Sequence, residues 1–371
     1  MYLPATRRHV GVWSLPNGTE YYRACLRWHL TVNTSPQHIH QLGLREVDRI
    51  EGTTRKLIAS AQPDGNITAF MMRLRADPNN YYTSKVRLAA LCELPYIKAT
   101  PGADESISVH FFIGCRVDVS AHGAAGFYSE PAADGSRPGL YLLSVARLDT
   151  KPKFIFDALT LHEAEPGHHI QTVAAMHDTI PYFRKLIAYW HYTYVPFNWR
   201  YYTSCSEGWA LYAEALGEEM GAYTSPHSLF GRYSYELFRA TRLVVDTGLH
   251  AFKWSRQRAV AYMRAHTTLA RESIDREVDR YIATPGQACS YKIGEMKIWE
   301  LRRKTEKALG EAFDLRDFHH VLLHLGFAPL SVMEEEIDNY IRALKAKATS
   351  GKHDLTLVVL LVTVACVVAS A

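Results

Sequence analysis

Five residues able to take part in metal or acid–base chemistry lie within one short stretch of this chain. Residues 162–169 read His-Glu-Ala-Glu-Pro-Gly-His-His and follow directly after an amphipathic run. Imidazole nitrogens and carboxylate oxygens are usual ligands of zinc. Two histidines at positions i and i+4 of a helix share one face and can bind the same ion, and a glutamate after the first can act as general base toward a water. The stretch therefore predicts a zinc site, with His162 as a ligand and Glu163 as the base.

The spacing of the second histidine is unusual. The position four residues after His162 is Pro166, whose ring collides with the carbonyl of the residue four positions earlier. Gly167 adds a position that can adopt unusual backbone angles. We expect Pro166-Gly167 to form a two-residue bulge in the helix that moves His168 to the ligand position. His169 is the alternative, but at i+7 it would lie about 10.5 Å along a regular helix, too far for zinc bonds of about 2.0–2.1 Å.

A second candidate segment begins at Glu207, 45 residues after His162, and reads Glu-Gly-Trp-Ala-Leu-Tyr-Ala-Glu. Catalytic zinc sites use three protein ligands and keep a fourth position open. We predict Glu207 as the third ligand. Glu214, two turns along the same helix face, is predicted to orient a ligand histidine. The alternative for Glu207 is a carboxylate that only interacts with the positive end of a helix.

Further motifs are spread over most of the chain. They are Leu15-Pro16-Asn17-Gly18 with Tyr21-Tyr22, Gly135-Ser136-Arg137-Pro138-Gly139, Asp246-Thr247-Gly248-Leu249-His250, Glu277-Val278-Asp279-Arg280-Tyr281-Ile282, Pro285-Gly286-Gln287-Ala288 with Tyr291-Lys292-Ile293-Gly294, and Phe318-His319. Together with His-Glu-x-x-Pro-Gly-His-His-x-Gln and the segment from Glu207 to Glu214, and in this order, they resemble the domain-of-unknown-function 885 family. The resemblance covers roughly residues 10–345.

The resemblance carries implications for activity and for the site. Members of that family are regarded as zinc metallopeptidases, distantly similar to the thimet oligopeptidase and carboxypeptidase Taq groups. It implies that Tyr291 donates a hydrogen bond to the oxyanion of the reaction. His169, Asp246 and His250 are further candidates for supporting the ligands or contacting substrate, although Asp246 and His250 could simply form an intrahelical contact. Family members usually carry a long N-terminal portion, so the resemblance also implies a chain truncated at its start.

Helical periodicity dominates the pattern, with one stretch of β character. Helices are expected at 36–57, 78–94, 153–176, 229–252, 274–282, 314–325 and 329–344. Short apolar runs at 109–113 and 139–143 predict strands. The expected fold is mainly α, a multi-helix zincin-like metallopeptidase domain (residues 1–345) with a small β-sheet next to the metal-binding helix. An edge strand of such a sheet can bind the main chain of a peptide substrate.

Composition excludes some classes of protein. The 371 residues carry a net charge of +4 without a basic cluster interleaved with aromatics, which argues against nucleic-acid binding. The six cysteines form no C-x-x-C pair, so they predict no structural zinc site.

Two features concern location. Residues 355–371 are uncharged and, after a polar linker at 346–354, predict a membrane-anchor helix or a GPI-attachment signal. Asn17, Asn33 and Asn66 begin N-x-S/T sequons, which makes them glycosylation candidates. We therefore expect a membrane-associated protein whose catalytic domain is extracellular or lumenal.

The expected function is hydrolysis of peptide bonds with one zinc ion per chain. His162, His168 and Glu207 are the predicted ligands. Two alternatives stay open at this point: a metal-dependent hydrolase of a non-peptide amide or ester, and a catalytically inactive membrane-tethered module of the same descent.

Overall fold

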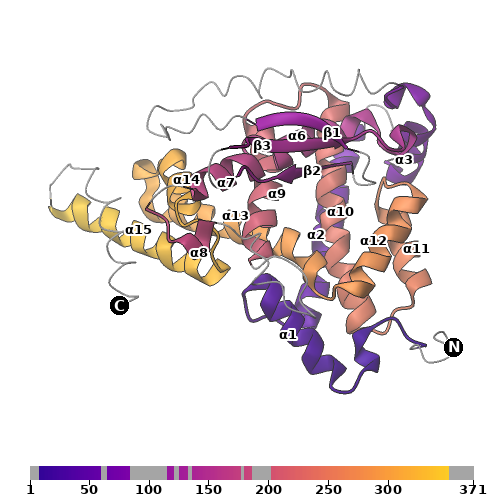
Figure 1. Cartoon of the computed structure of the whole chain (residues 1–371), viewed down its shortest axis with the longest axis horizontal. Helices are drawn as coiled ribbons and strands as arrows, with labels where there is room; N and C mark the ends of the chain where they lie inside the picture. Colours follow the sequence, from indigo (N-terminus) through magenta and orange to yellow (C-terminus); the bar gives the residue numbers. More distant parts are fainter. Residues whose placement is uncertain are drawn as a thin grey trace.

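The computed structural model describes residues 8–59, 65–83, 115–120, 125–132, 136–176, 179–185 and 202–350, and these form a mainly helical protein (Figure 1). The helices are α1 (Gly18–Leu30), α2 (Pro36–Ile58), α3 (Ile67–Ala76), α6 (Phe156–Glu163), α7 (His168–Ala175), α8 (Tyr182–Lys185), α9 (Thr203–Glu219), α10 (Pro226–His250), α11 (Arg256–His266), α12 (Arg271–Ala283), α13 (Ser290–Leu309), α14 (Leu315–Leu323) and α15 (Leu330–Ser350). The strands are β1 (Cys115–Ser120), β2 (Gly126–Ser129) and β3 (Gly139–Ser144).

Local sequence signals explain where the long helices begin. Ser35 caps α2, because its hydroxyl accepts a hydrogen bond from His38 N at 3.1 Å and Pro36 occupies the first helical position. Ser225 and Ser228 form a reciprocal capping box at the start of α10, again ahead of a proline. The helix predicted to begin at the Ser-Pro pair is therefore confirmed.

Two pairs of helices form the scaffold of the protein. Helix α10 packs against α2, and α9 packs against α13. Both contacts are close because glycines lie at the crossings: a Cβ on Gly43 would lie 2.7 Å from Leu243 Cβ, and one on Gly208 would lie 2.6 Å from Gly294 Cα. The close approach of α9 and α13 matters for function, since these helices carry Glu207 and Tyr291.

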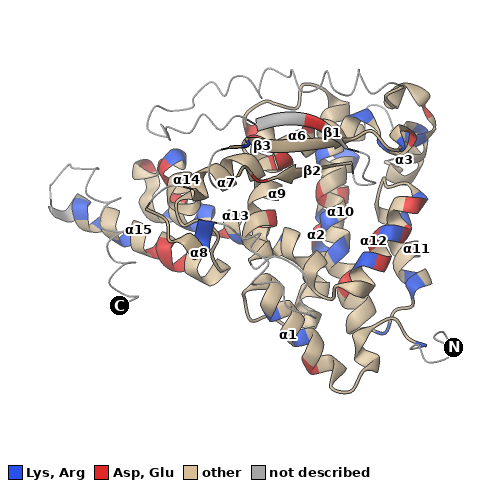
Figure 2. Cartoon of the chain, viewed as in Figure 1, with Lys and Arg blue, Asp and Glu red and all other residues tan. Residues whose placement is uncertain are grey.

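The apolar core is divided among these helices. One cluster joins α9 and α13 to α14 and α15 and includes Tyr212, Ile298, Phe318 and Ile337. Another joins α10 to α11 and α12 and includes Val244, Met263 and Val278. Charged residues of both signs alternate along α10 and α12 (Figure 2), in keeping with the small net charge.

The sheet has the strand order β1-β3-β2, with β1 parallel and β2 antiparallel to β3. Strand β3 confirms the strand predicted at 139–143. Residues 109–113, the other predicted strand, lie outside the described residues, and β2 falls between the two predicted strands, where the sequence predicted none. Strand β2 contacts α6, so the sheet lies next to the candidate metal site as predicted (Figure 1).

The C-terminal predictions need correction. None of the helices in the described part of the chain is both long enough and apolar enough to cross a membrane, so the transmembrane helix, and membrane association through it, find no support. Residues 355–371, on which that prediction rests, lie outside the described residues. Helix α15 continues to Ser350, into the stretch where a polar linker was expected.

Candidate metal centre

The histidine-rich stretch forms two helices separated by a turn. Helix α6 ends at Glu163 and α7 begins at His168, with a cis peptide bond between Glu165 and Pro166. The predicted bulge is thus a complete break of the helix. A Cβ on Gly167 would lie 2.0 Å from the carbonyl oxygen of His162. Glycine is required here by this close approach and not by a left-handed backbone, since its φ is −75°.

The second motif holds this turn in place. The indole Nε1 of Trp209, on α9, donates a hydrogen bond of 2.9 Å to the carbonyl oxygen of Pro166. Trp209 is itself buried. Because Glu207 lies two residues before this indole on the same helix, the contact fixes α9 relative to the break between α6 and α7. The two motifs, 45 residues apart in sequence, therefore form one structural unit.

The break brings three predicted ligands together. The ring centroids of His162 and His168 are 4.8 Å apart, and Glu207 Oε2 lies 3.4 Å from Nε2 of His162 and 3.5 Å from Nε2 of His168. Two ligands on a tetrahedral zinc with bonds of about 2.05 Å are separated by about 3.3 Å. The two separations from Glu207 Oε2 therefore fit ligands of a single ion, and the donor set of two imidazoles and one carboxylate suits zinc.

Glu163 lies beside these ligands without forming an ion pair to a lysine or arginine in the described part of the chain. Its carboxylate, His162 and His168 each offer a ligand atom within 4.8 Å of the others. The side chain is buried but lines the same cavity as the ligands. A carboxylate at this separation can reach a water placed next to the ion, as general-base catalysis requires.

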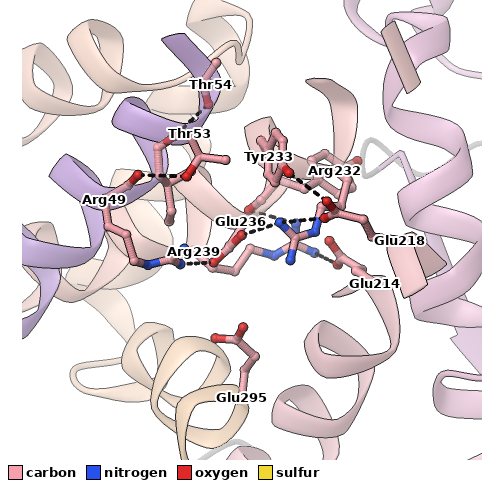
Figure 3. Close-up of polar contacts among 12 residues, drawn as sticks. Arg49, Thr53, Thr54, Glu214, Glu218, Arg232, Tyr233, Glu236, Arg239 and Glu295 are labelled. Carbon is pink, nitrogen blue, oxygen red and sulfur yellow. Dashed lines mark hydrogen bonds and ion pairs between the residues drawn. The ribbon is translucent and has the colours of Figure 1, made fainter. Parts of the chain in front are cut away.

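A chain of polar contacts orients His162. Its Nδ1 lies 2.8 Å from Glu214 Oε1, and the same oxygen lies 3.2 Å from Nη2 of Arg239. Figure 3 shows Arg239 on α10 reaching Glu214 on α9. All three side chains are buried. The contact of Nδ1 with a carboxylate leaves Nε2 as the atom that faces Glu207, which is the tautomer that a metal ligand needs.

The two adjacent histidines have different environments. His168 faces the ligand cluster, and its Nδ1 lies 3.5 Å from Ser206 Oγ on α9. His169 is 3% exposed, and its Nδ1 lies 2.9 Å from the hydroxyl of Tyr128 on β2. His169 thus connects α7 to the sheet and does not join the three predicted ligands.

The charges of the cluster perturb one another strongly. Burial alone would raise the pKa of Glu207, but His162 and His168 lower it well below its ordinary value. Burial would lower the pKa of His162, but Glu207 and Glu214 raise it to about 9. In the protein without an ion, a positive charge on His162 therefore compensates the neighbouring carboxylates.

A cavity of about 690 Å³ opens onto the cluster and is lined by α6, α9, α10, α12 and β2. Tyr291, the first residue after the start of α13, lines it too, and the guanidinium carbon of Arg242 lies 4.2 Å from the centre of its ring. Burial, and then the charge of Glu207, raise the pKa of the Tyr291 hydroxyl. The phenol therefore stays protonated near Glu207 and can donate a hydrogen bond into the cavity.

The structure places Asp246 and His250 away from this cavity. Asp246 accepts a hydrogen bond of 2.6 Å from Tyr22 and two from Gly286 N. His250 Nε2 lies 2.9 Å from the carbonyl oxygen of Tyr281. Both side chains are fully buried, and neither forms the intrahelical contact with the other. They connect α10 to α1 and to the segment after α12.

Sequence reasoning missed several residues of the site, above all Arg239 and Tyr235. Tyr235 lines the cavity near Glu163. Burial, and then the charges of Glu214 and Glu163, raise the pKa of its phenol. The sequence did contain a signal for Arg239. Arg239 and Arg242 interrupt an otherwise apolar stretch of a long helix, and a charged residue in a buried stretch usually pairs with an opposite charge. The glycosylation candidates Asn17, Asn33 and Asn66 are all exposed, and Asn66 caps α3 through its side chain.

The fold and the site together define a mainly helical protein with a buried His-His-Glu cluster at a helix break. Residues 1–337 match the family model described as "Bacterial protein of unknown function (DUF885)", and the chain belongs to this family. The resemblance noted from the motifs is thereby confirmed. No curated protein matches the chain.

Two solved structures are similar to the chain. One is described as "the putative lipoprotein from Colwellia psychrerythraea"; it is 34% identical, with a TM-score of 0.81 over 92% of this chain. The other, a "putative lipoprotein of unknown function from Shewanella oneidensis", is 18% identical, with a TM-score of 0.73 over 90% of this chain, and shows the fold alone. The chain spans 58% and 61% of the lengths of these two proteins.

Proposed function

We propose that this chain is a zinc-dependent peptidase whose ion is bound by His162, His168 and Glu207. The observation that carries the proposal is the position of Glu207 Oε2, 3.4 Å and 3.5 Å from two imidazole nitrogens. These separations are close to the edge of a zinc tetrahedron, about 3.3 Å, and longer than good hydrogen bonds. The arrangement of α6, α7 and α9 beside a small sheet supports a zincin-like fold.

The residues around the cluster suggest their roles in hydrolysis. Zinc bound there would lower the pKa of a coordinated water to about 7 and polarise the scissile carbonyl. Glu163 would accept a proton as the water oxygen bonds to the carbonyl carbon, and would donate it to the amine nitrogen as the C–N bond breaks. The hydroxyl of Tyr291 would donate a hydrogen bond to the oxyanion formed in between.

Other features support a peptide as the substrate. The cavity volume of about 690 Å³ lies within the usual range for small ligands or short peptide segments, about 300–1,000 Å³. Strand β2 lines the cavity at the outer position of the three described strands. The prediction that a strand beside the metal site binds the substrate main chain therefore stays part of the proposal.

For location, we propose only an association with membranes through an attached lipid. The support is that both similar solved structures are described as putative lipoproteins. Incorporation of a labelled fatty acid into the natural protein in its host tests this, and a protein that takes up no label would contradict it.

Elemental analysis tests the metal site. We expect about one zinc per chain in the wild type, retained in His169→Ala and lost in His168→Ala and Glu207→Gln. His169→Ala is a matched control, because the two histidines are adjacent and only one faces the cluster. Circular dichroism must show that the variants are folded. A folded wild-type protein that binds no zinc would overturn the proposal.

Peptide hydrolysis tests the activity. A library of internally quenched peptides should be cleaved by the zinc-loaded protein. Zinc binding with cleavage of simple amides or esters, but not of peptides, would assign the site to a different hydrolase. Zinc binding without hydrolysis of any of these substrates would identify an inactive binding module.

A further inference from the structure

One part of the cavity wall carries a buried cation that forms no ion pair with the carboxylates that the structure describes. Lys151, between β3 and α6, is 4% exposed and lines the cavity. Its ammonium donates hydrogen bonds to Ser144 Oγ, at 3.0 Å, and to the carbonyl oxygen of Ala146. Both acceptors are neutral. Burial of an ammonium is costly unless a counter-charge compensates it, and Lys151 forms no ion pair with a carboxylate in the described residues.

A second cation faces the same space from α12. Ser273, Arg276, Glu277 and Arg280 recur at helical spacing, and all four line the cavity. The Arg276 guanidinium donates to Ser273 Oγ at 3.0 Å and forms no ion pair with any described carboxylate. Its charge, together with the larger effect of burial, lowers the pKa of Lys151, so the two cations lie close enough to repel.

The remaining cations of this wall are already neutralised. Glu277 lies 3.0 Å from Arg242 and 2.9 Å from Arg280. Asp149, two residues before Lys151, is exposed and lies 3.0 Å from Arg147; its charge raises the pKa of Lys151, an effect smaller than that of Arg276. The unpaired positive charge of the cavity is therefore concentrated at Lys151 and Arg276, in the same cavity as the proposed zinc ligands.

We propose that Lys151 and Arg276 bind a carboxylate of the substrate peptide, and so select acidic or C-terminal segments for cleavage. This inference rests on the proposed peptidase function. An ammonium and a guanidinium form charge-assisted hydrogen bonds with a carboxylate, and the Ser273 hydroxyl can add a further donor. The carboxylate can belong to the C-terminus or to an aspartate or glutamate side chain, and the two sources are separable by experiment.

Three peptides of one sequence distinguish the sources. The first has a free C-terminus and no acidic side chain, the second is its C-terminal amide, and the third is an amide with one glutamine replaced by glutamate. For the zinc-loaded wild type, we expect kcat/KM for the first or the third to exceed that for the second by about tenfold or more. Preference for the first identifies a C-terminal carboxylate, and preference for the third an acidic side chain.

Arg276→Gln is the main variant, because Arg276 is exposed and its loss should not unfold α12. It should reduce the preference to about twofold, whereas Arg271→Gln, an exposed arginine of the same helix that does not line the cavity, should leave it unchanged. Lys151→Gln should act in the same direction, provided that its melting curve shows a folded protein. Equal hydrolysis of all three peptides by the wild type would overturn the carboxylate site and leave the peptidase proposal intact.

Equilibrium binding separates the two proposals. Fluorescence anisotropy of labelled peptides with Glu163→Gln measures affinity without turnover. Tighter binding of the carboxylate peptide, lost in Glu163→Gln/Arg276→Gln, would support the site even if the wild type cleaves nothing. Equal affinities for the acid and the amide would overturn it.

Discussion

The chain buries carboxylates in two regions and compensates them differently. In the first region, the Lys292 cluster, Lys292 Nζ lies 2.6–3.2 Å from the carboxylates of Glu46, Glu236 and Glu295. Arg232 lies 2.8 Å from Glu236 (Figure 3). In the second region, the metal centre, Glu163 and Glu207 form no ion pair with any lysine or arginine in the described part of the chain.

The two regions differ in which groups compensate the charge of their buried carboxylates. Burial alone would raise the pKa of Glu236, but Lys292, Arg232 and Arg49 hold it below its ordinary value. In that cluster the three cations Lys292, Arg232 and Arg49 face the three carboxylates of Glu46, Glu236 and Glu295. In the candidate metal centre, the cationic groups that contact Glu207 among the described residues are imidazoles, which agrees with the proposal that a metal ion binds there.

Asp246 shows a third way to bury a carboxylate. Among the described residues, its hydrogen-bond partners are Tyr22 and Gly286 N and include no lysine or arginine, and Asp246 does not line the cavity. Burial raises its pKa to about 7, with Tyr22 and Gly286 N opposing the effect. It therefore holds a proton over much of the acidic range. Because the three groups of buried carboxylates are compensated differently, substitutions and pH should affect them differently.

The largest effect is expected for Glu163→Gln. Loss of the general base should reduce kcat by roughly 10²–10⁴-fold, while zinc content stays near one per chain. The matched change in the other region, Glu295→Gln, should leave kcat near the wild-type value. Kinetics with a quenched peptide and elemental analysis check both. A Glu163→Gln variant with wild-type kcat would remove Glu163 from the mechanism.

Lys292→Met should destabilise the fold strongly. It leaves Glu236 and Glu295 buried without their shared counter-charge, at a cost of roughly 3–5 kcal/mol in the free energy of unfolding. Urea unfolding measures this. Removal of zinc by a chelator should not change the size of the effect, because the two regions are compensated separately. A loss below about 1 kcal/mol would mean that water reaches the cluster.

Glu214→Gln should weaken the zinc site without abolishing it. Glu214 contacts His162 Nδ1 and not the ion, so zinc affinity should fall by about 10–100-fold. Competition with a chromophoric chelator gives the affinity. Glu219→Gln, an exposed change at the end of the same helix, is the control. An unchanged affinity would show that Glu214 only neutralises Arg239.

The smallest effect is expected from pH acting on Asp246. Its folded pKa of about 7 exceeds the ordinary value of 3.8, so the folded state holds the proton more tightly. The stability from this residue is full below pH 4 and is lost as the pH rises toward 7, by about 1.4 kcal/mol per pH unit within that window. From pH 5 to pH 6, the free energy of unfolding of the wild type should fall by that amount relative to the free energy of unfolding of Asp246→Asn. Equal changes in the two proteins would contradict the prediction.

Much of the fold and of the site could be predicted from local signals. The helical spacing of apolar residues predicted α2, α10, α12, α14 and α15, because caps and apolar spacing act within a few residues. The Pro-Gly pair predicted a bulge within one helix, because its effect on the backbone is steric; the structure instead shows a complete break between Glu163 and His168. The choice of His168 over His169 followed from helix geometry. The sequence could not predict β2, since strands depend on their partners.

What the sequence by itself determined is the chemistry of the donors and an interruption of the regular helix at Pro166-Gly167. The tertiary structure alone decided that Glu207 Oε2 lies between two imidazoles and that Arg239 supports Glu214. It also decided that Asp246 faces Tyr22 and that Lys151 forms no ion pair with a carboxylate of the described residues. The physical reason is range: backbone sterics and caps act over a few residues, whereas the partner of a buried charge is set by which helices pack together.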